Sequence, residues 1–358
     1  MIDKQRRIMR IPLPVPLIRE MDAIILQEVG GYVTRAEFIV DAIQERILEL
    51  TIGDEEDAGA PRPVNQAVEQ AEQDEVVASG VSAMASGAMT PMHPLLAQTR
   101  IQVPARGFAI EDHPVRPDGV ALFGLHNRDY PSLWALARLA VAAGDQPVPI
   151  ESYYTQVLLD AWKFGALLLA LEKQSGPKRT ALFPTNIQKE KAAEAAFRTF
   201  AIGDYRTDSG QVPATHGPLF EWRVAAVKET SDGLQIGVTS EGWDLLGAID
   251  GISVDEPHPP SIARSFFDHL ARNSGADWEG FVEIFNAIGS EGANRQQVLK
   301  HFAEVWSDWT ENEVSTNAAG YVARAREWGL LEPKQTEGRY QLTQLGLEQL
   351  TTNMTGAI

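Results

Sequence analysis

Arginines are the side chains in this sequence whose type and spacing fit a chemical task, and they gather at two places. Near the C-terminus stand Arg324, Arg326 and Arg339. At the N-terminus, five basic residues stand within positions 1–19 against the single acid Asp3: Lys4, Arg6, Arg7, Arg10 and Arg19. Guanidinium groups pair with phosphate oxygens and with the edges of bases, so both places predict contact with double-stranded DNA.

A different set of polar residues lies in the middle of the chain. Asp204 is followed by Glu221 and Arg223 on an expected strand, and then by Lys228. A metal-dependent nuclease needs two acids on adjacent strands and a nearby lysine to bind Mg²⁺ and activate water. The spacing here is loose, and an arginine stands where the lysine is expected. We keep a nuclease as a minor alternative.

Other enzyme signatures are missing from the sequence. The chain has no cysteine, which excludes thiol nucleophiles, disulfides and cysteine-ligated metals. It has no glycine loop ending in Gly-Lys-Ser/Thr and no Gly-x-Ser-x-Gly elbow. Its histidines are scattered, without the spacing of a helical metal pair. We therefore expect a protein without catalytic residues, metal or cofactor.

The overall charge limits how this chain can bind DNA. Its 358 residues carry a net charge of −18, whereas neutralising phosphates needs clustered lysine and arginine. A basic tip on an acidic molecule fits DNA contact by a small part of the chain. No apolar run reaches the roughly 18 residues that a membrane helix needs, and no apolar signal core follows the N-terminus. We expect a cytoplasmic protein that does not contact a membrane.

Residues 5–50 have the pattern of one compact module. The segment 7–13 alternates as a strand, and a helix follows. Thr34 and Glu37 then form a capping box that begins a second helix. One strand and two short helices bury too little surface to fold alone, and the strand has no partner within the segment. Pairing with a second chain solves both problems, so the pattern predicts a homodimer.

The order strand, helix, turn and helix, with Leu13-Pro14 at the strand end and Arg35-Ala36-Glu37 at the second helix, resembles the ribbon–helix–helix family of DNA-binding regulators. The resemblance implies a dimer whose two-stranded ribbon lies in the major groove. It also implies phosphate contacts at the ribbon and at the start of the second helix. The implied DNA-binding residues are Arg6, Arg7, Ile8, Arg10, Pro12, Thr34 and Arg35.

The ribbon departs from the family in one respect. Its outward positions are Ile8, Arg10 and Pro12, and of these side chains only Arg10 can donate a hydrogen bond. Family members usually carry polar residues at most outward positions. The alternative is a module that dimerises without touching DNA.

Two later stretches of the sequence look alike. Gly233 to Gly242 and Gly338 to Gly346 both run from a turn glycine through a short strand to a threonine, and then to a glycine three residues on. The threonines are Thr239 and Thr343. The match predicts one module used twice.

The second copy, residues 294–352, resembles a winged-helix domain, because the segment from Tyr321 to Pro333 looks like a recognition helix that runs into a wing strand. Spacing predicts that Val322 and Trp328 lie on the buried face. Winged helices also bind proteins, and residues 290–358 carry more acids than bases, so a protein partner is an equal alternative here. For DNA, the resemblance implies Asn317, Tyr321 and Arg324 on the open face, Arg326 beside them and Arg339 in the wing.

These patterns together predict a mainly α fold with small β. It comprises a ribbon–helix–helix dimer module (1–50), a flexible acidic linker (51–100), a winged-helix-like module (101–255) and a winged-helix module (256–358). Expected helices are 132–143, 153–171, 189–200, 240–249, 262–271, 278–288, 295–306, 314–328 and 344–351, and expected strands are 219–227 and 234–238.

The function that these observations predict is non-enzymatic DNA binding by a dimer. The protein is then a transcriptional regulator or a DNA-organising adaptor with the ribbon in the major groove. The alternative is a scaffold in a multi-subunit partition, replication or defence complex, with winged helices that bind protein.

Overall fold

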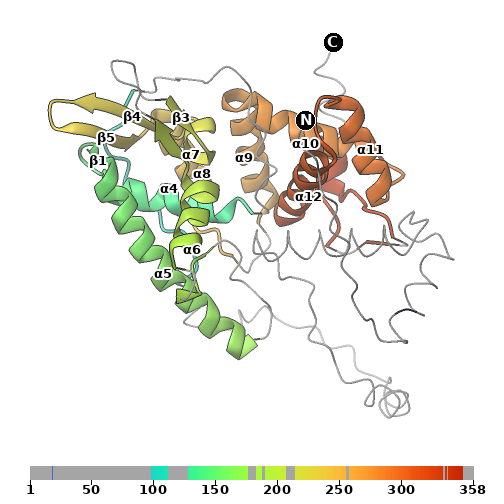
Figure 1. Cartoon of the computed structure of the whole chain (residues 1–358), viewed down its shortest axis with the longest axis horizontal. Coiled ribbons are helices and arrows are strands. Elements are labelled where there is room, and N and C mark those ends of the chain that lie inside the picture. The colour runs from blue at the N-terminus through green and yellow to red at the C-terminus, as the bar shows by residue number, and fades with distance from the viewer. Residues whose placement is uncertain are drawn as a thin grey trace, which may run out of the picture. The chain divides into compact units, whose positions relative to one another are not determined.

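A computed structural model describes residues 18, 98–111, 128–175, 183–187, 190–206, 214–254, 258–333, 335–336 and 338–349. These residues are mainly helical with small sheets, which confirms the predicted fold class at that level. They divide into two compact units. The first unit holds the described residues of 98–111 and 129–258, and the second unit holds those of 259–349 together with Ile18 and Arg128. Figure 1 labels their helices and strands.

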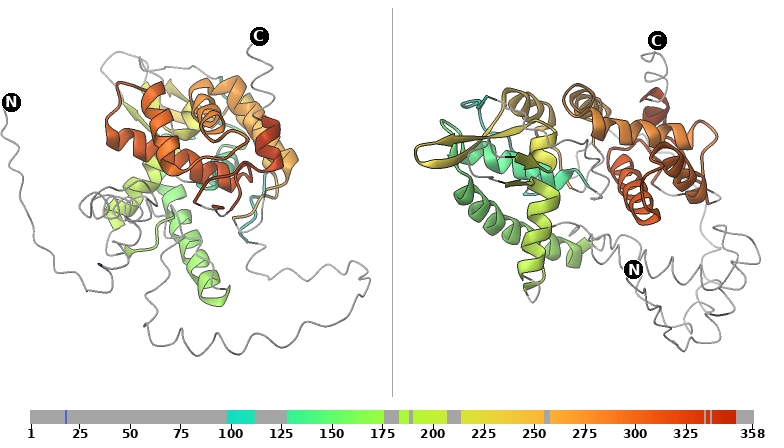
Figure 2. Two further views of the ribbon diagram at one scale, coloured as in Figure 1. Left: turned by 90° about the vertical axis from the view of Figure 1, so that its right-hand side faces the viewer. Right: turned by 45° about the horizontal axis from the view of Figure 1, so that its top comes forward.

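An antiparallel sheet of three strands organises the first unit. Its order is β1–β5–β4: β1 (Val148–Pro149) pairs with β5 (Gly233–Val238), and β5 pairs with β4 (Ala225–Thr230). The hairpin of β4 and β5 projects from the unit (Figure 1; Figure 2, right). Both strands are buried at the base of the hairpin and exposed near its tip. Only the base therefore contributes to the core.

Helices precede and follow these strands in the chain. The helix α4 (Tyr130–Ala142) precedes β1, α5 (Ile150–Ser175) follows it, and α8 (Ser240–Ile249) follows β5. A proline in the first turn begins α4, because proline lacks the N–H that would find no partner there. The segment between α5 and β4 contains α6 (Glu190–Phe197), a π-helical turn η3 (Arg198–Ile202), the two-stranded ribbon of β2 (Asp204–Arg206) and β3 (Ala214–His216), and the single turn α7 (Pro218–Glu221).

Aromatic side chains fill the core between α4 and α5. The ring of Trp134 lies 5.4 Å from that of Phe164 and meets the ring of Phe183 edge to face at 5.3 Å. Phe197, at the end of α6, meets Trp134 edge to face at 6.1 Å. Such pairs contribute about 0.5–1.5 kcal/mol each beyond the area that they bury. This cluster fixes α6 and η3 against α4.

Four helices form most of the second unit: α9 (Pro260–Asn273), α10 (Gly275–Ile288), α11 (Arg295–Val305) and α12 (Glu311–Glu327). The helices α11 and α12 each begin with a reciprocal capping box. The Thr310 hydroxyl accepts from the N–H of Glu313, whose side chain accepts from the N–H of Thr310. Asn294 and Gln297 make the equivalent pair at α11.

Short bridges complete the second unit and repeat the strand order of the first. The segment after α10 pairs at Ala293 with Tyr340, and the last segment pairs at Leu342 with Leu331, which follows α12. The segment after α10 thus pairs with the last segment, and the last segment pairs with the one after α12, each through a single bridge. This is the order β1–β5–β4.

Each of the two units contains the same set of hydrogen bonds around a threonine, which we call the threonine corner. In the first unit the Thr239 hydroxyl donates to the carbonyl of Arg223 at 2.7 Å and accepts from the N–H of Gly242 at 2.9 Å. The backbone N–H of Thr239 donates to the carbonyl of Val224 at 3.1 Å. One side chain therefore joins the start of the middle strand to the start of the last helix.

The second unit makes the same three bonds. The Thr343 hydroxyl donates to the carbonyl of Gly329 at 2.7 Å and accepts from the N–H of Gly346 at 3.2 Å. Its N–H donates to the carbonyl of Leu330 at 2.9 Å. A module used twice, as the sequence predicts, accounts for this identity of bonding.

Backbone conformation strengthens the equivalence of the two corners. Arg223 and Gly329 both have positive φ, 58° and 69°, and each follows a fully buried tryptophan, Trp222 or Trp328. A left-handed residue ends a helix and turns the chain into the next segment. At Gly242 and Gly346 a Cβ would lie within 2.3 Å of a carbonyl oxygen of the strand, so both positions need glycine.

Valine in place of either threonine is expected to lower the free energy of unfolding by about 1–2 kcal/mol, because it keeps the shape but loses both hydroxyl bonds. Urea unfolding of Thr239→Val and Thr343→Val in the full chain measures this. Thr230→Val is the matched control: it also removes two hydroxyl bonds, but at the exposed tip of the hairpin, where water replaces them, so it should change the free energy little. A loss in only one copy would contradict the equivalence of the two corners.

The structure confirms most predicted helices and corrects one predicted strand. The helix predicted at 240–249 has those bounds, and those predicted near 132, 153, 262, 278, 295 and 314 are present. The strand predicted at 219–227 is wrong at its start, because Pro218 begins the helical turn α7 and the strand begins only at Ala225. In the part of the chain that the structure describes, no helix is long and apolar enough to cross a membrane.

Candidate functional site

The helix α12 carries most of the predicted C-terminal DNA contacts, and the structure corrects the face on which they lie. Tyr321 and Arg324 are both fully buried, and Asn317 is 6% exposed. These three side chains were predicted on the open face, and that prediction is wrong. Other parts of the second unit cover the side of α12 that bears them, so in this structure they cannot reach a DNA groove.

Asp277 is the reason that Arg324 lies in the core. Asp277 is in the first turn of α10, and both of its carboxylate oxygens accept from Arg324, at 2.7 Å each. Both side chains are fully buried. A bidentate pair of this kind satisfies the planar guanidinium and fixes its orientation. The charge predicted to face DNA is therefore paired inside the protein.

Tyr321 completes the same network. Its hydroxyl donates to Asp277 at 2.7 Å, and the Arg324 guanidinium lies over the rings of Phe281 and Tyr321, 4.7 and 5.2 Å from their centroids. Gly280 makes room for the tyrosine, since a Cβ there would lie 2.1 Å from Cζ of Tyr321. The network joins α10 to α12 and is a feature of the core.

The side of α12 that keeps contact with solvent is small and nearly neutral. It carries Asn312, Thr316, Ala319 and Ala323, at the spacing of one helical stripe. Base readout needs hydrogen-bond donors such as arginine or asparagine along the helix that enters the groove. On this stripe Asn312 in the first turn has such a group, and the stripe ends at Arg326 in the last turn, which lies against Tyr340.

Arg326 and Arg339 lie at the surface but are held by contacts within the unit. The Arg326 guanidinium lies 5.3 Å from the ring centroid of Tyr340. Arg339 donates to the carbonyl of Gly292 at 2.5 Å and exchanges two backbone bonds of 3.0 Å with Thr336, which close the turn at Gly338. Both are half-buried. Only part of each arginine side chain is therefore accessible to a ligand such as a DNA phosphate.

The first unit presents no comparable helix before its hairpin. The turn α7 precedes β4, and Pro218, Leu219 and Phe220 in it are buried. The exposed part of the hairpin carries Lys228 beside Glu229 and Asp232. The exposed part of this hairpin is therefore not a basic surface.

The predicted contacts of the N-terminal module lie outside the described residues. Of positions 1–50 the structure describes Ile18 alone, which is helical. The DNA contacts predicted there remain predictions: Arg6, Arg7, Ile8, Arg10, Pro12, Thr34 and Arg35.

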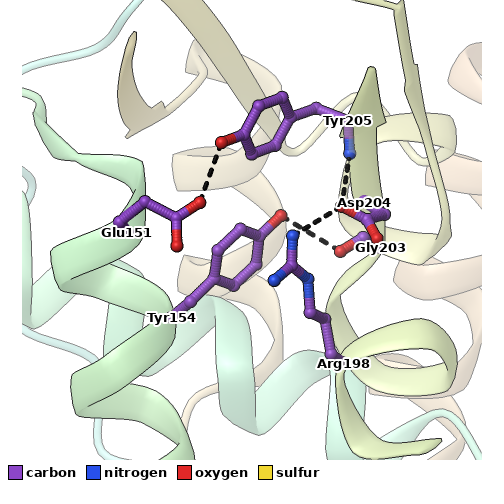
Figure 3. A network of polar contacts seen from close by, with 6 residues as sticks. All are labelled: Glu151, Tyr154, Arg198, Gly203, Asp204 and Tyr205. Carbon is purple, nitrogen blue, oxygen red and sulfur yellow. Dashed lines mark hydrogen bonds and ion pairs between the residues drawn. The ribbon is translucent and has the colours of Figure 1, made fainter. Parts of the chain in front are cut away.

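A polar cluster that the sequence analysis missed joins α5 to the segment η3–β2 (Figure 3). Arg198 donates to Asp204 at 2.6 Å, and its guanidinium lies 4.0 Å from the ring centroid of Tyr154. The hydroxyl of Tyr154 donates to the carbonyl of Gly203 at 3.1 Å, and that of Tyr205 donates to Glu151 at 2.8 Å. The aromatic and charged residues alternate between two elements that are distant in sequence, so no local spacing signals the cluster.

The chemistry of this cluster fits a structural contact between α5 and the η3–β2 segment better than a catalytic centre. Burial raises the pKa of the Tyr154 phenol, and the hydrogen bond to Glu151 raises the pKa of Tyr205. Both phenols are therefore un-ionised at neutral pH and act as donors. The charge of Arg198 is paired with Asp204. Each polar group holds a neighbour in place, and Arg198, the first residue of the π-helical turn, contacts both Tyr154 and Asp204.

The residues of the nuclease alternative do not form the arrangement that it requires. Glu221 lies in the turn α7 rather than on a strand, and Asp204 pairs with Arg198. Among the described residues, no group of three histidine, aspartate or glutamate side chains could hold a metal ion. The predicted acid pair on adjacent strands is wrong.

Comparisons with protein-family models, with curated proteins and with solved structures find no match to this chain. The function of the chain is therefore inferred from the chemistry of its own residues.

Proposed function

We propose that this protein is a non-enzymatic, dimeric DNA-binding adaptor, either a transcriptional regulator or a DNA-organising protein. Residues 5–50 form a ribbon–helix–helix module that pairs two chains and reads the major groove through Arg10, while Arg6 and Arg7 contact phosphates. The two repeated modules are winged helices that hold a protein partner.

The residues around α12 support the assignment of DNA binding to the N-terminal module and of protein binding to the repeated modules. Its central arginine is paired with Asp277 in the core, and its solvent side is a nearly neutral stripe. Interfaces between proteins tolerate such small, uncharged surfaces, whereas DNA affinity comes mainly from cations at phosphates. The N-terminal segment has the densest positive charge in the sequence. DNA contact is therefore best assigned to that segment.

The winged-helix assignment is supported by topology and by the repeat. In both units a segment that follows a helix pairs with the last segment, which also pairs with the segment before it; the first unit does so in strands and the second unit in isolated bridges. In both units the threonine corner joins the start of the middle segment to the start of the last helix. Winged helices serve as DNA readers and as protein-binding modules, and the charge of α12 favours the second use here.

Single substitutions in the full chain test the assignment. Arg10→Ala is expected to weaken binding to the preferred DNA sequence about tenfold or more, since a base contact contributes about 1–3 kcal/mol of discrimination. Arg326→Ala should leave DNA affinity within about twofold. Fluorescence anisotropy with a labelled duplex, first selected from a random pool, measures both.

The matched control is Arg272→Ala, which removes the same charge from an exposed side chain that bonds only within its own helix. If Arg10→Ala binds like Arg272→Ala and Arg326→Ala loses affinity, then the winged helix reads DNA and the proposed division is wrong.

A further inference from the structure

The turn between α11 and α12 holds a pair of stacked tryptophans at the surface of the second unit. The rings of Trp306 and Trp309 are nearly parallel, with 11° between their planes and 4.8 Å between centroids. Trp306 also packs on Phe302, which is fully buried. Both tryptophans keep solvent contact, and Val305 beside them is 40% exposed. We call residues 304–311 the tryptophan turn.

The charged residues around this apolar surface are nearly all acids. Asp308 and Glu311 are exposed, and so is Glu304, which makes a 3.8 Å ion pair with Lys300. Glu313 follows in the same helix start, where hydrogen bonds from Thr310 lower its pKa and keep it charged. An acidic rim repels nucleic acid and disfavours pairing of this face with the same face of a second copy. The surface fits a ligand that is both basic and apolar.

The sequence contains one segment with that character, residues 4–11. It alternates basic side chains with Ile8, Met9 and Ile11. Arginine binds the face of tryptophan better than the face of any other aromatic ring, and its apolar stem covers neighbouring aliphatic surface. The segment is joined to the tryptophan turn by the chain itself, so its effective concentration there is high even if its affinity is weak.

We propose that the tryptophan turn is a docking surface for the basic N-terminal segment of this chain, from the same copy or from its partner, and that it competes with DNA for that segment. The inference depends on the proposed function, because it assigns to the ribbon a second, acidic ligand inside the protein. DNA and the tryptophan turn then offer the same arginines two alternative anionic surfaces. A free adaptor holds its ribbon on the turn, and DNA displaces it.

Site-specific photocross-linking in the full chain tests the docking. A benzoylphenylalanine replaces Ile8, and mass spectrometry maps the products after irradiation. We expect cross-links to residues 304–311, a loss of about fivefold or more in the double variant Asp308→Lys, Glu311→Lys, and suppression by excess duplex DNA. The matched control Asp268→Lys, Glu279→Lys makes the same charge change at exposed acids of the same unit and should leave the cross-links unchanged.

The outcomes separate this inference from the proposed function. Cross-links that map elsewhere, or that survive the charge reversal at the turn, overturn the docking even if the chain binds DNA. Cross-links at the turn in a chain that does not bind DNA support the docking and contradict the DNA-binding proposal. Mixing isotope-labelled and unlabelled chains shows which copy supplies the segment, and Trp309→Ala gives an independent loss of the same cross-links.

Discussion

Replacing Asp277 with alanine is expected to lower the free energy of unfolding of the second unit by about 3–5 kcal/mol. The reason is that Arg324 would keep its charge in a fully buried position without a partner, which costs far more than the pair itself contributes. Tyr321 would lose its acceptor in the same step. Urea unfolding followed by tryptophan fluorescence measures the change, because Trp328 lies in the core of the same unit.

Two further variants identify the cause of this loss. In the double variant Asp277→Leu, Arg324→Met the buried charges are both removed, and most of the lost stability should return. Asp268→Ala removes an exposed acid of α9 and should change unfolding by less than about 0.5 kcal/mol. If Asp277→Ala is as stable as Asp268→Ala, then the buried pair does not hold α10 and α12 together.

Capping signals and the internal repeat made much of this fold predictable. Thr310 and Glu313 indicate the start of α12, because the side chain of each accepts a hydrogen bond from the backbone N–H of the other. The repeated threonine and glycine predict the twice-used corner at Thr239 and Thr343. The same repeat extends back to Trp222 and Trp328, and following it that far would have predicted the end of a helix where a strand was expected.

The orientation of α12 was not predictable from the helix alone. Spacing places Val322 and Trp328 on one buried face, and both are buried. It does not show that a second face is covered too, because that depends on α10, which supplies Asp277. An arginine in a recognition-like helix looks the same in sequence whether it faces DNA or an acid far along the chain. Only the glycine at 280, which makes room for Tyr321, hints at such close packing.

The polar cluster of the first unit escaped prediction for a similar reason. Tyr154 and Glu151 lie on α5, and Arg198 and Asp204 come from the η3–β2 segment (Figure 3). Arg198 lies in a π-helical turn, which residue spacing does not predict.

The salt dependence of DNA binding tests the central claim most directly. Each arginine that neutralises a phosphate contributes roughly 0.9 to the slope of log affinity against log salt concentration. The slope for the full chain is compared with that of the triple variant Arg6→Ala, Arg7→Ala, Arg10→Ala and with a control that loses three surface arginines of the described units, Arg106→Ala, Arg264→Ala, Arg272→Ala. We predict that the triple N-terminal variant loses most of its affinity and about 2 from the slope per chain, whereas the control keeps both. An unchanged slope in the N-terminal variant, with a reduced slope in the control, would contradict the account.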